Sequence, residues 1–350
     1  MITDLRLQQF RSYSDQSFEI GAGVNIVVGP NASGKTNLLE AVLVLARGGS
    51  YRVADADLVQ FDKPWARIDA DLSNGQRRTI KLTPEQKPSK SYEIEGKAYQ
   101  RLTLQHTLPV VLFEPNHLRL LTGSPVGRRS YLDDILEQTV PTYGATLRHY
   151  RRALAQRNAL LKTNAARDQF FVWNLRLSEL GGHIVKARTD LVETIRTEVQ
   201  ALYQDISRTA TEIEILYDTK LNQKHYESQL LHNLESQLDK DLLRGFTSVG
   251  PHREDLGVSF NGRPASETAS RGEARTLVLA LKIIELKLLE QTRGVTPLLL
   301  LDDVFSELDG ARRRALTEHL SNYQTFITTT DADVVVQHFT ENCTIIPLVG

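Results

Sequence analysis

Residues 24–36 read VNIVVGPNASGKT, a short apolar run followed at once by a glycine-rich loop of the pattern GxxxxGKT. Residues 37–42, NLLEAV, favour a helix, so the predicted order is strand, loop and helix. Such a loop wraps phosphate groups with backbone N–H groups, and its glycines let the chain turn sharply and approach closely. The first turn of the helix adds unpaired N–H donors and the positive end of its dipole. The stretch therefore predicts a phosphate-binding loop in an α/β fold.

Two side chains of this loop have separate predicted tasks. Lys35 can reach the β- and γ-phosphates of a nucleotide, and the hydroxyl of Thr36 is placed to ligate Mg²⁺. A chain of this length would contain the bare pattern by chance in roughly one case in a hundred. We therefore predict a nucleotide site rather than an ordinary glycine-rich turn. The predicted nucleotide-binding residues of this stretch are Gly29, Pro30, Asn31, Ala32, Ser33, Gly34, Lys35, Thr36 and Asn37.

Composition limits the class of protein. The chain has 350 residues and 41% hydrophobic content, which allow a sizeable core and two domains. Its one cysteine, Cys343, excludes an intramolecular disulfide and a multi-cysteine metal site. The first residues are charged where a signal peptide is apolar, and no apolar run could cross a bilayer, so we expect a soluble, cytoplasmic protein. The net charge of −1 means that nucleic-acid binding would depend on local basic patches.

Three regions differ in residue pattern. Residues 1–113 mix β-like segments with the helix after the loop, and residues 245–350 return to this mixed pattern. Residues 114–244 are dominated by Leu, Ala, Arg, Glu and Gln at helical spacing. We predict a head with a mixed or parallel sheet, built from the first and third regions. The middle region is predicted to be an inserted, mostly helical arm or lobe.

The same patterns predict individual elements. Strands are expected at residues 3–10, 17–20, 24–28, 67–72, 77–82, 91–95, 212–217, 258–260, 297–301 and 325–329. Helices are expected at residues 35–46, 128–138, 142–162, 169–207, 226–243, 271–291 and 310–320. The pair Gly181-Gly182 could interrupt the fourth of these helices.

A second motif, LLLLDDVFSELD at residues 298–309, places acidic residues directly after four leucines. Four leucines suit a strand covered on both faces, and ligands bind at the carboxyl edge of such sheets. Asp302 can hold the Mg²⁺ that Thr36 contacts, and Asp303 can orient an attacking water or accept its proton. The alternative is a buried strand ended by a polar turn, with Asp302 as a helix cap. The phosphate-binding loop in the same chain makes this alternative the weaker one.

A third motif, ASRGEART at residues 269–276, opens a long helix. Ser270 and Glu273 form a capping box, so that a well-started helix is the favoured interpretation of the motif taken alone. The functional alternative is a second phosphate-binding helix start, with the Ser270 hydroxyl and the Gly272 backbone facing an anion.

Together and in this order, the three motifs resemble the ABC-type ATPases, and within them the RecF family of the SMC-like DNA-repair branch. The resemblance covers most of the chain, through the segments FRSY at 10–13, TNLLEA at 36–41, VLFEP at 111–115, RRSYLD at 128–133, GPHREDL at 250–256 and DDVFSELD at 302–309. It implies an ABC-type ATPase head that carries an inserted helical second domain.

The resemblance also assigns roles by position. Lys35 and Asp303 would be catalytic, and Thr36 and Asp302 would hold the metal. Arg11 and Ser12 would contact the nucleotide from the N-terminal side. A signature motif that touches the γ-phosphate bound by the opposite subunit would contain Ser270, Gly272 and Arg275. The interface between the two subunits would include Ser306 and Asp309.

The function that the resemblance implies is a slow ATPase that binds duplex or gapped DNA, with hydrolysis acting as a release timer. ATP would join two copies of the chain, and the protein would help to load recombinase in DNA replication, recombination, repair and the SOS response. RecR and RecO would be partners. One alternative is the nucleotide-binding subunit of an ABC transporter, although no switch histidine follows residues 325–329 and the helical insertion is long. A structural SMC-like protein with a long coiled coil ranks last, because the insertion allows only a short arm.

Several positions depart from the family pattern or have no assigned role. Ala32 stands where the family commonly has glycine, so the loop is expected to be strained there or to follow a different path. Gln100 and Gln105 are both only loosely placed for the Q-loop of the family, and neither His252 nor Arg253 has an assigned task. For DNA contacts, residues that share one helical face are the candidates: Arg148, Arg151 and Arg152, with Arg157 further along. The basic pairs and triplets at 128–129 and 312–314 are weaker candidates, and a solvated charged face is the more common meaning of each cluster.

Overall fold

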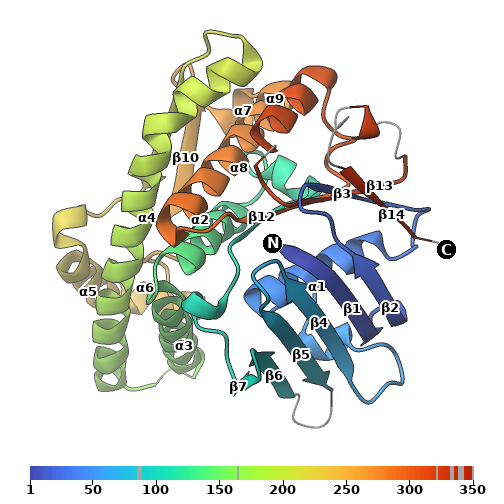
Figure 1. Cartoon of the computed structure of the whole chain (residues 1–350). Helices are drawn as coiled ribbons and strands as arrows, with labels where there is room; N and C mark the ends of the chain where they lie inside the picture. The colour runs from blue at the N-terminus through green and yellow to red at the C-terminus, as the bar shows by residue number, and fades with distance from the viewer. Residues whose placement is uncertain (85–88, 164, 321, 332–334, 338–342, 349–350) are drawn as a thin grey trace. The chain divides into compact units, whose positions relative to one another are not determined.

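Figure 1 shows the computed structural model of the chain. The structure describes residues 1–84, 89–163, 165–320, 322–331, 335–337 and 343–348. Their contacts group into two compact units. Unit 1 comprises residues 1–118 and 282–350, and unit 2 comprises residues 119–281.

The centre of unit 1 is a parallel sheet of five strands in the order β14-β3-β13-β12-β8. The strands are β3 (Val24–Val28), β8 (Val110–Phe113), β12 (Leu298–Asp302), β13 (Thr325–Thr329) and β14 (Cys343–Pro347). β12 and β13 are buried along their whole length, as expected of strands that are covered on both faces. Because the strands are parallel, the loop after β3, the two acids at the end of β12 and the residue after β8 meet at one edge of the sheet.

A second sheet in unit 1 is antiparallel, with the order β2-β1-β4-β5-β6-β7. Its strands are β1 (Ile2–Phe10), β2 (Tyr13–Glu19), β4 (Ala66–Leu72), β5 (Arg77–Thr83), β6 (Ser89–Ile94) and β7 (Lys97–Tyr99). Helix α1 (Lys35–Arg47) contacts strands of both sheets, which explains why it is apolar on most of its circumference. Helix α9 (Gly310–Leu320) connects β12 with β13.

Unit 2 is mainly helical, with α2 (Pro125–Thr139), α3 (Tyr143–Lys162), α4 (Phe171–Ser207), α5 (Tyr226–Ser236), α6 (Leu238–Arg244) and α7 (Ala265–Thr268). The long helix α4, yellow-green in Figure 1, packs against α3 and α5. A small antiparallel sheet contains β9 (Ile213–Asp218), β10 (Asp255–Phe260) and β11 (Arg263–Pro264). Helix α8 (Arg271–Arg293) gives its first half to unit 2 and its second half to unit 1. Short 3₁₀ helices lie at Asp55–Leu58, Leu104–His106, Pro115–Arg119, Arg167–Phe170 and Gln223–His225.

The pair Gly181-Gly182 does not interrupt α4, which is continuous. A Cβ on Gly181 would lie 2.8 Å from Leu230 Cδ2, and one on Gly182 would collide with the Glu227 side chain. The two glycines therefore allow α5 to approach α4 closely.

The structure differs from the sequence-based prediction in three further places. The helix expected at residues 226–243 is two helices, α5 and α6, with a break at Gln237. Strands β7, β8 and β14 and the short helix α7 were not expected, because short segments of a few residues carry little periodicity. Residues 245–281, expected in the head, belong to unit 2, since β10 pairs with β9. Because these units are defined by contacts and are not the same as domains, the predicted domain boundaries at 113 and 244 stay a prediction.

Among the described residues, no helix combines the length and the apolar character that crossing a membrane requires.

Candidate nucleotide site

The phosphate-binding loop, residues 29–34, connects β3 with α1 at the edge of the parallel sheet. Gly34 has a φ of 97°, which side-chain-bearing residues rarely adopt. A Cβ at this position would lie 2.7 Å from Ser12 Oγ, and the Tyr13 hydroxyl donates a hydrogen bond of 2.9 Å to the Gly34 carbonyl. The sequence FRSY thus packs directly on the start of α1, and the conformation of this start depends on glycine.

Ala32 has a φ of 66°, so the strain expected at this position is present. A left-handed conformation costs an alanine roughly 1–2 kcal/mol relative to its ordinary conformations. The neighbouring Ser33 hydroxyl is buried and has no hydrogen-bond partner among the described residues. A buried donor of this kind inside a phosphate-binding loop fits a ligand with acceptor oxygens.

Lys35 and Thr36 begin α1, and their tasks toward phosphate and Mg²⁺ stay predictions. The Lys35 ammonium donates to the carbonyl oxygens of Gly29 and Pro30, each at 2.9 Å, so it is held against the loop. The Thr36 hydroxyl donates to Asp302 Oδ1 at 3.0 Å, across 266 residues of sequence. Two oxygens at neighbouring positions around one Mg²⁺ lie about 2.9 Å apart, since each Mg–O distance is about 2.0–2.1 Å. Thr36 and Asp302 therefore fit a shared Mg²⁺.

No group of three His, Cys, Asp or Glu side chains among the described residues could hold a metal by itself. Mg²⁺ does not require one, because it is usually bound by one or two protein oxygens together with phosphate oxygens and water.

Thr328, on the neighbouring strand β13, positions Asp302, the last residue of β12, and Asp303, which follows it. Its hydroxyl donates to Asp302 Oδ1 at 2.8 Å and accepts a hydrogen bond of 2.8 Å from the Asp303 backbone N–H. Asp303 has a φ of 52°, a strained conformation that lies directly after the strand. Burial, and next the charge of Asp302, raise the pKa of Asp303, whereas Lys35 opposes this shift. A carboxylate with a raised pKa accepts a proton more readily than an ordinary aspartate.

Glu114 lies near the site, although no sequence motif predicts a role for it in nucleotide binding. It follows β8, which pairs with β12, and burial and then the charge of Asp302 raise its pKa. Tyr51 also lies near Asp302, with its hydroxyl 3.5 Å from Oδ2. No sequence motif predicts the position of either residue, because that position depends on which strands are neighbours in the sheet.

The predicted residues Arg11, Ser12 and Asn37 lie together at the start of α1. The Asn37 amide donates to Ser12 Oγ at 3.0 Å. Arg11 has a φ of 53°, and its Nε donates to Glu40 Oε2 at 2.8 Å. Arg11, Ser12 and Asn37 line a hollow of about 480 Å³ together with residues 56–57 and 59–63. A second hollow, of about 630 Å³, is lined by Ser12, by Ala32 and Ser33 of the loop and by residues 344–348.

The capping box predicted at the start of α8 is confirmed. The Ser270 N–H donates to Glu273 Oε2 at 2.8 Å, and the Glu273 N–H donates to Ser270 Oγ at 3.2 Å. Gly272 and Arg275 lie in the first turns of the same helix, in unit 2. The role of Ser270, Gly272 and Arg275 toward a phosphate stays a prediction.

The segment after the two acids is braced by α9. The Ser306 hydroxyl donates to the Asp303 carbonyl at 2.8 Å, and Asp309 Oδ1 accepts from the Arg312 N–H at 3.0 Å. Arg313 donates to the carbonyl oxygens of Phe305 and Ser306. This part of the basic cluster at 312–314 therefore holds the segment in place.

The candidates for DNA contact differ in exposure. Arg148, Arg151 and Arg152 are exposed on α3. Arg157 is fully buried and donates to Asp241 Oδ2 at 2.8 Å, so the expectation that it extends this exposed face is wrong. At 3.6 residues per turn, Arg157 lies about 180° around α3 from Arg148, so it is on the opposite face of the helix, toward the interior of unit 2. Arg128 also has a structural contact, an ion pair with Asp255.

Comparison with known proteins agrees with these observations. Residues 1–347 match the model of the family described as RecF/RecN/SMC N terminal domain, a class of SMC-like ATPases. The chain is 36% identical over 342 residues to the DNA replication and repair protein RecF of Heliobacterium modesticaldum, covering 94% of this chain and 92% of the relative. It is 37% identical over 348 residues to the protein of the same name from Acaryochloris marina, with the same two coverages. The chain therefore belongs to the RecF family.

Solved structures show the same likeness. A structure described as the recombination mediator protein RecF-ATPrS in the RecFOR pathway matches with a TM-score of 0.88 and 30% identity, over 99% of this chain and 96% of that chain. The Smc head domain of Pyrococcus furiosus matches with a TM-score of 0.53 and 16% identity, over 99% and 92%, which shows the fold alone. The predicted fold class, an ABC-type ATPase head with a helical insertion, is confirmed. The transporter alternative gains no support.

Proposed function

We propose that this chain is an ATP-dependent DNA-binding ATPase that acts in DNA replication and recombinational repair. The observation that carries the proposal is the contact of Thr36 with Asp302, next to the buried Lys35 and the strained Asp303. Relatives are named DNA replication and repair proteins, and one solved structure is titled RecF-ATP in the RecFOR pathway. On this basis we propose cytoplasmic action with RecR and RecO as partners.

In the proposed reaction, backbone N–H groups of the loop and the Lys35 ammonium bind the β- and γ-phosphates. Mg²⁺ held by Thr36 and Asp302 would neutralise charge on the phosphates when bound. Asp303 orients the attacking water and accepts its proton, a task that its raised pKa favours. Thr328 keeps both acids in register by accepting from one and donating to the other.

The second half of the site is proposed to come from another copy of the chain. The Ser270 and Gly272 helix start, with Arg275, would contact the γ-phosphate that the opposite copy holds. Ser306 and Asp309 would lie at the same interface, on the segment that Arg313 braces. ATP would thus join two copies around duplex or gapped DNA, and hydrolysis would release them, which predicts slow turnover.

Sedimentation with ATP, with and without duplex DNA, tests this proposal. We compare the wild type with Lys35→Met, Asp303→Asn and the control Lys186→Met, which removes an exposed ammonium from α4. Asp303→Asn should hydrolyse ATP roughly 10²–10⁴-fold more slowly and accumulate as a dimer on DNA. Lys35→Met should stay monomeric, whereas Lys186→Met should behave as the wild type. Dimerisation of Lys35→Met to the wild-type extent would contradict the proposal.

A further inference from the structure

Unit 2 contains a hollow of about 170 Å³ between α2, α3, α4 and the segment after α6. Three arginines line it, Arg129, Arg151 and Arg188, and we call it the arginine pocket. Pro251 and His252, from the GPHREDL segment to which no role in nucleotide binding is assigned, form part of its wall.

The wall of the arginine pocket carries excess positive charge. Asp133 is the one carboxylate among its described lining residues, against three guanidinium groups. Arg188 is buried and donates to both oxygens of Asp133, while Arg151 lies 3.7 Å from Oδ2. The nearby carboxylates have other partners: Asp255 pairs with Arg128, and Glu254 accepts from Tyr217, Tyr226 and Thr219.

His252 adds no charge to this balance. Its Nε2 lies 3.0 Å from the Thr247 carbonyl, which can only accept, so Nε2 carries the proton. Its Nδ1 then accepts from the Tyr150 hydroxyl at 2.7 Å. Burial lowers the pKa of His252 to about 4, which keeps the ring neutral at pH 7.

Arg129 is the group of the pocket whose charge is least compensated. Its Nη1 donates to the Glu254 carbonyl at 2.8 Å, and among the described residues this is the one hydrogen bond of its guanidinium. A guanidinium has five N–H donors. Burial, and next the neighbouring charge of Arg188, lower the pKa of Arg129. An anion in the pocket would relieve this repulsion and accept hydrogen bonds from the remaining N–H donors of Arg129.

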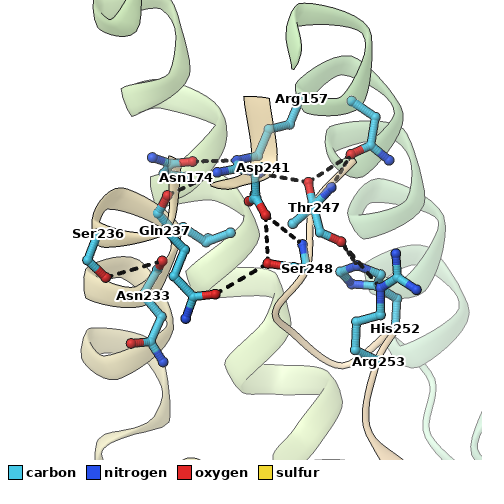
Figure 2. Close-up of polar contacts among 12 residues, drawn as sticks. Arg157, Asn174, Asn233, Ser236, Gln237, Asp241, Thr247, Ser248, His252 and Arg253 are labelled. Atoms are coloured by element: carbon cyan, nitrogen blue, oxygen red, sulfur yellow. Dashed lines mark hydrogen bonds and ion pairs between the residues drawn. The ribbon is translucent and has the colours of Figure 1, made fainter. Parts of the chain in front are cut away.

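The wall of the pocket is rigid. Figure 2 shows a polar network that includes Thr247, Ser248, His252 and Arg253, in which Arg157 and Ser248 donate to Asp241. Thr247 donates to Asn158 at 2.8 Å, and its carbonyl accepts from His252 and Arg253. A preformed wall loses little conformational entropy when a ligand binds.

The volume selects a small ligand. At about 30 Å³ for each water in the liquid, 170 Å³ holds five or six waters. Pockets for drug-sized molecules measure about 300–1,000 Å³, so a nucleotide with base and sugar would not fit. A single tetrahedral anion fits this volume. The surroundings of the pocket indicate an anion that is part of a polymer. Arg151 is 63% exposed, and Arg148 and Arg152, which are one turn apart on the same helix, are exposed beside it.

We propose that the arginine pocket binds a backbone phosphate of duplex DNA, with Arg129 and Arg151 as its two main donors. This inference rests on the proposed function, since it gives the DNA-binding activity a site. The exposed Arg148 and Arg152 then meet neighbouring phosphates of the same strand.

Fluorescence anisotropy with a labelled duplex, the full chain and ATP at several salt concentrations tests the pocket. Arg151→Gln should weaken binding several-fold, and Arg129→Gln with Arg151→Gln about tenfold or more, since hydrogen bonds to charged groups are strong. Each lost phosphate contact should reduce the slope of log K against log salt by about 1. The control Arg196→Gln, exposed on α4, should leave affinity unchanged within twofold. Inorganic phosphate at the concentration of DNA phosphate should not compete.

The outcomes separate the two proposals. If the double variant binds duplex as well as the wild type does, the inference is wrong, and the arginine pocket would instead bind an acidic group of another protein. The proposed DNA-binding function would not be affected by this outcome. Full competition by inorganic phosphate would also overturn it. If the wild type binds no duplex with ATP, the proposed function itself fails.

A second measurement does not depend on removing an arginine. Ser130→Cys, in a Cys343→Ser background, places a thiol at the pocket, and a photoactivatable group attached to it should crosslink to bound duplex. Thr194→Cys on the exposed face of α4 is the matched control. Equal crosslinking of the two variants would overturn the proposal.

Discussion

The phosphate-binding loop of unit 1 and residues 245–254 of unit 2 are both short loops with glycine, but they differ in whether their polar side chains have partners. The first depends on backbone conformation, with φ values of 97° at Gly34 and 66° at Ala32, and it leaves the buried Ser33 hydroxyl without a partner among the described residues. The second also has glycines with positive φ, 72° at Gly245 and 118° at Gly250, but its side chains are bonded as well, because Thr247 donates to Asn158 and Ser248 donates to Asp241. A receptor for a ligand keeps donors open, whereas a supporting wall has its donors satisfied.

The largest effect is expected from a substitution that disrupts the backbone conformation of the phosphate-binding loop. Gly34→Ala should lower ATP affinity on the order of a hundredfold, because the new Cβ collides with Ser12 Oγ and strains the start of α1. The control Gly75→Ala has a similar φ of 82° but no atom within 4 Å of the new Cβ. It should cost about 1 kcal/mol of stability and no ATP affinity. Calorimetric titration and urea unfolding measure both, and equal ATP binding by both variants would contradict the role of Gly34.

The next largest effect is expected from a substitution in the side-chain network around Asp241. Arg157→Met leaves Asp241 buried and unpaired, which should lower the free energy of unfolding by about 3–5 kcal/mol. Arg157→Met with Asp241→Leu should recover part of this loss, because the uncompensated charge is gone. Urea unfolding measures the series. The ion pair does not stabilise the unit as described if the double variant is no more stable than the single one.

A third prediction uses pH to separate the loops. His252 has a pKa of about 4 in the folded chain and about 6.5 when unfolded, so the unfolded state binds more protons between these values. Stability should therefore fall by up to about 3 kcal/mol as the pH drops from about 6.5 to 4. His252→Asn should flatten this part of the profile. Because burial also lowers the pKa of His117 in unit 1, the difference between wild type and variant is the quantity to measure.

The smallest effect sharpens the comparison at Ala32. Ala32→Gly should stabilise the chain by up to about 1 kcal/mol, since glycine adopts the positive φ without strain. The control Ala54→Gly, at an exposed position with a φ of −70°, should destabilise by about 0.5–1 kcal/mol. Thermal unfolding compares the two, and a shift of the same sign in both would contradict strain at Ala32.

These two kinds of loop also explain what the sequence could predict. The phosphate-binding loop is made of consecutive residues, so its place between β3 and α1 and the pairing of Thr36 with Asp302 followed from motifs. The chemistry of Glu114 and Tyr51 did not, because it depends on the neighbours of β12 in the sheet. The arginine pocket was out of reach for the same reason, since its residues come from α2, α3, α4 and a distant loop. Arg157 shows a different error: its position about 180° around the helix from Arg148 already indicates another face, and its buried environment is set by Asp241 and Thr247.

The topology of the parallel sheet has a consequence for synthesis of the protein. Strand β3, which carries the phosphate-binding loop, is flanked by β13 and β14, and Asn25 bonds to Thr325 across 300 residues of sequence. During translation, β3 therefore has neither of its partner strands until residues 325–347 have left the ribosome. Contacts of such long range form late and slowly. The nucleotide site is among the first parts of the chain to be made and among the last to be completed.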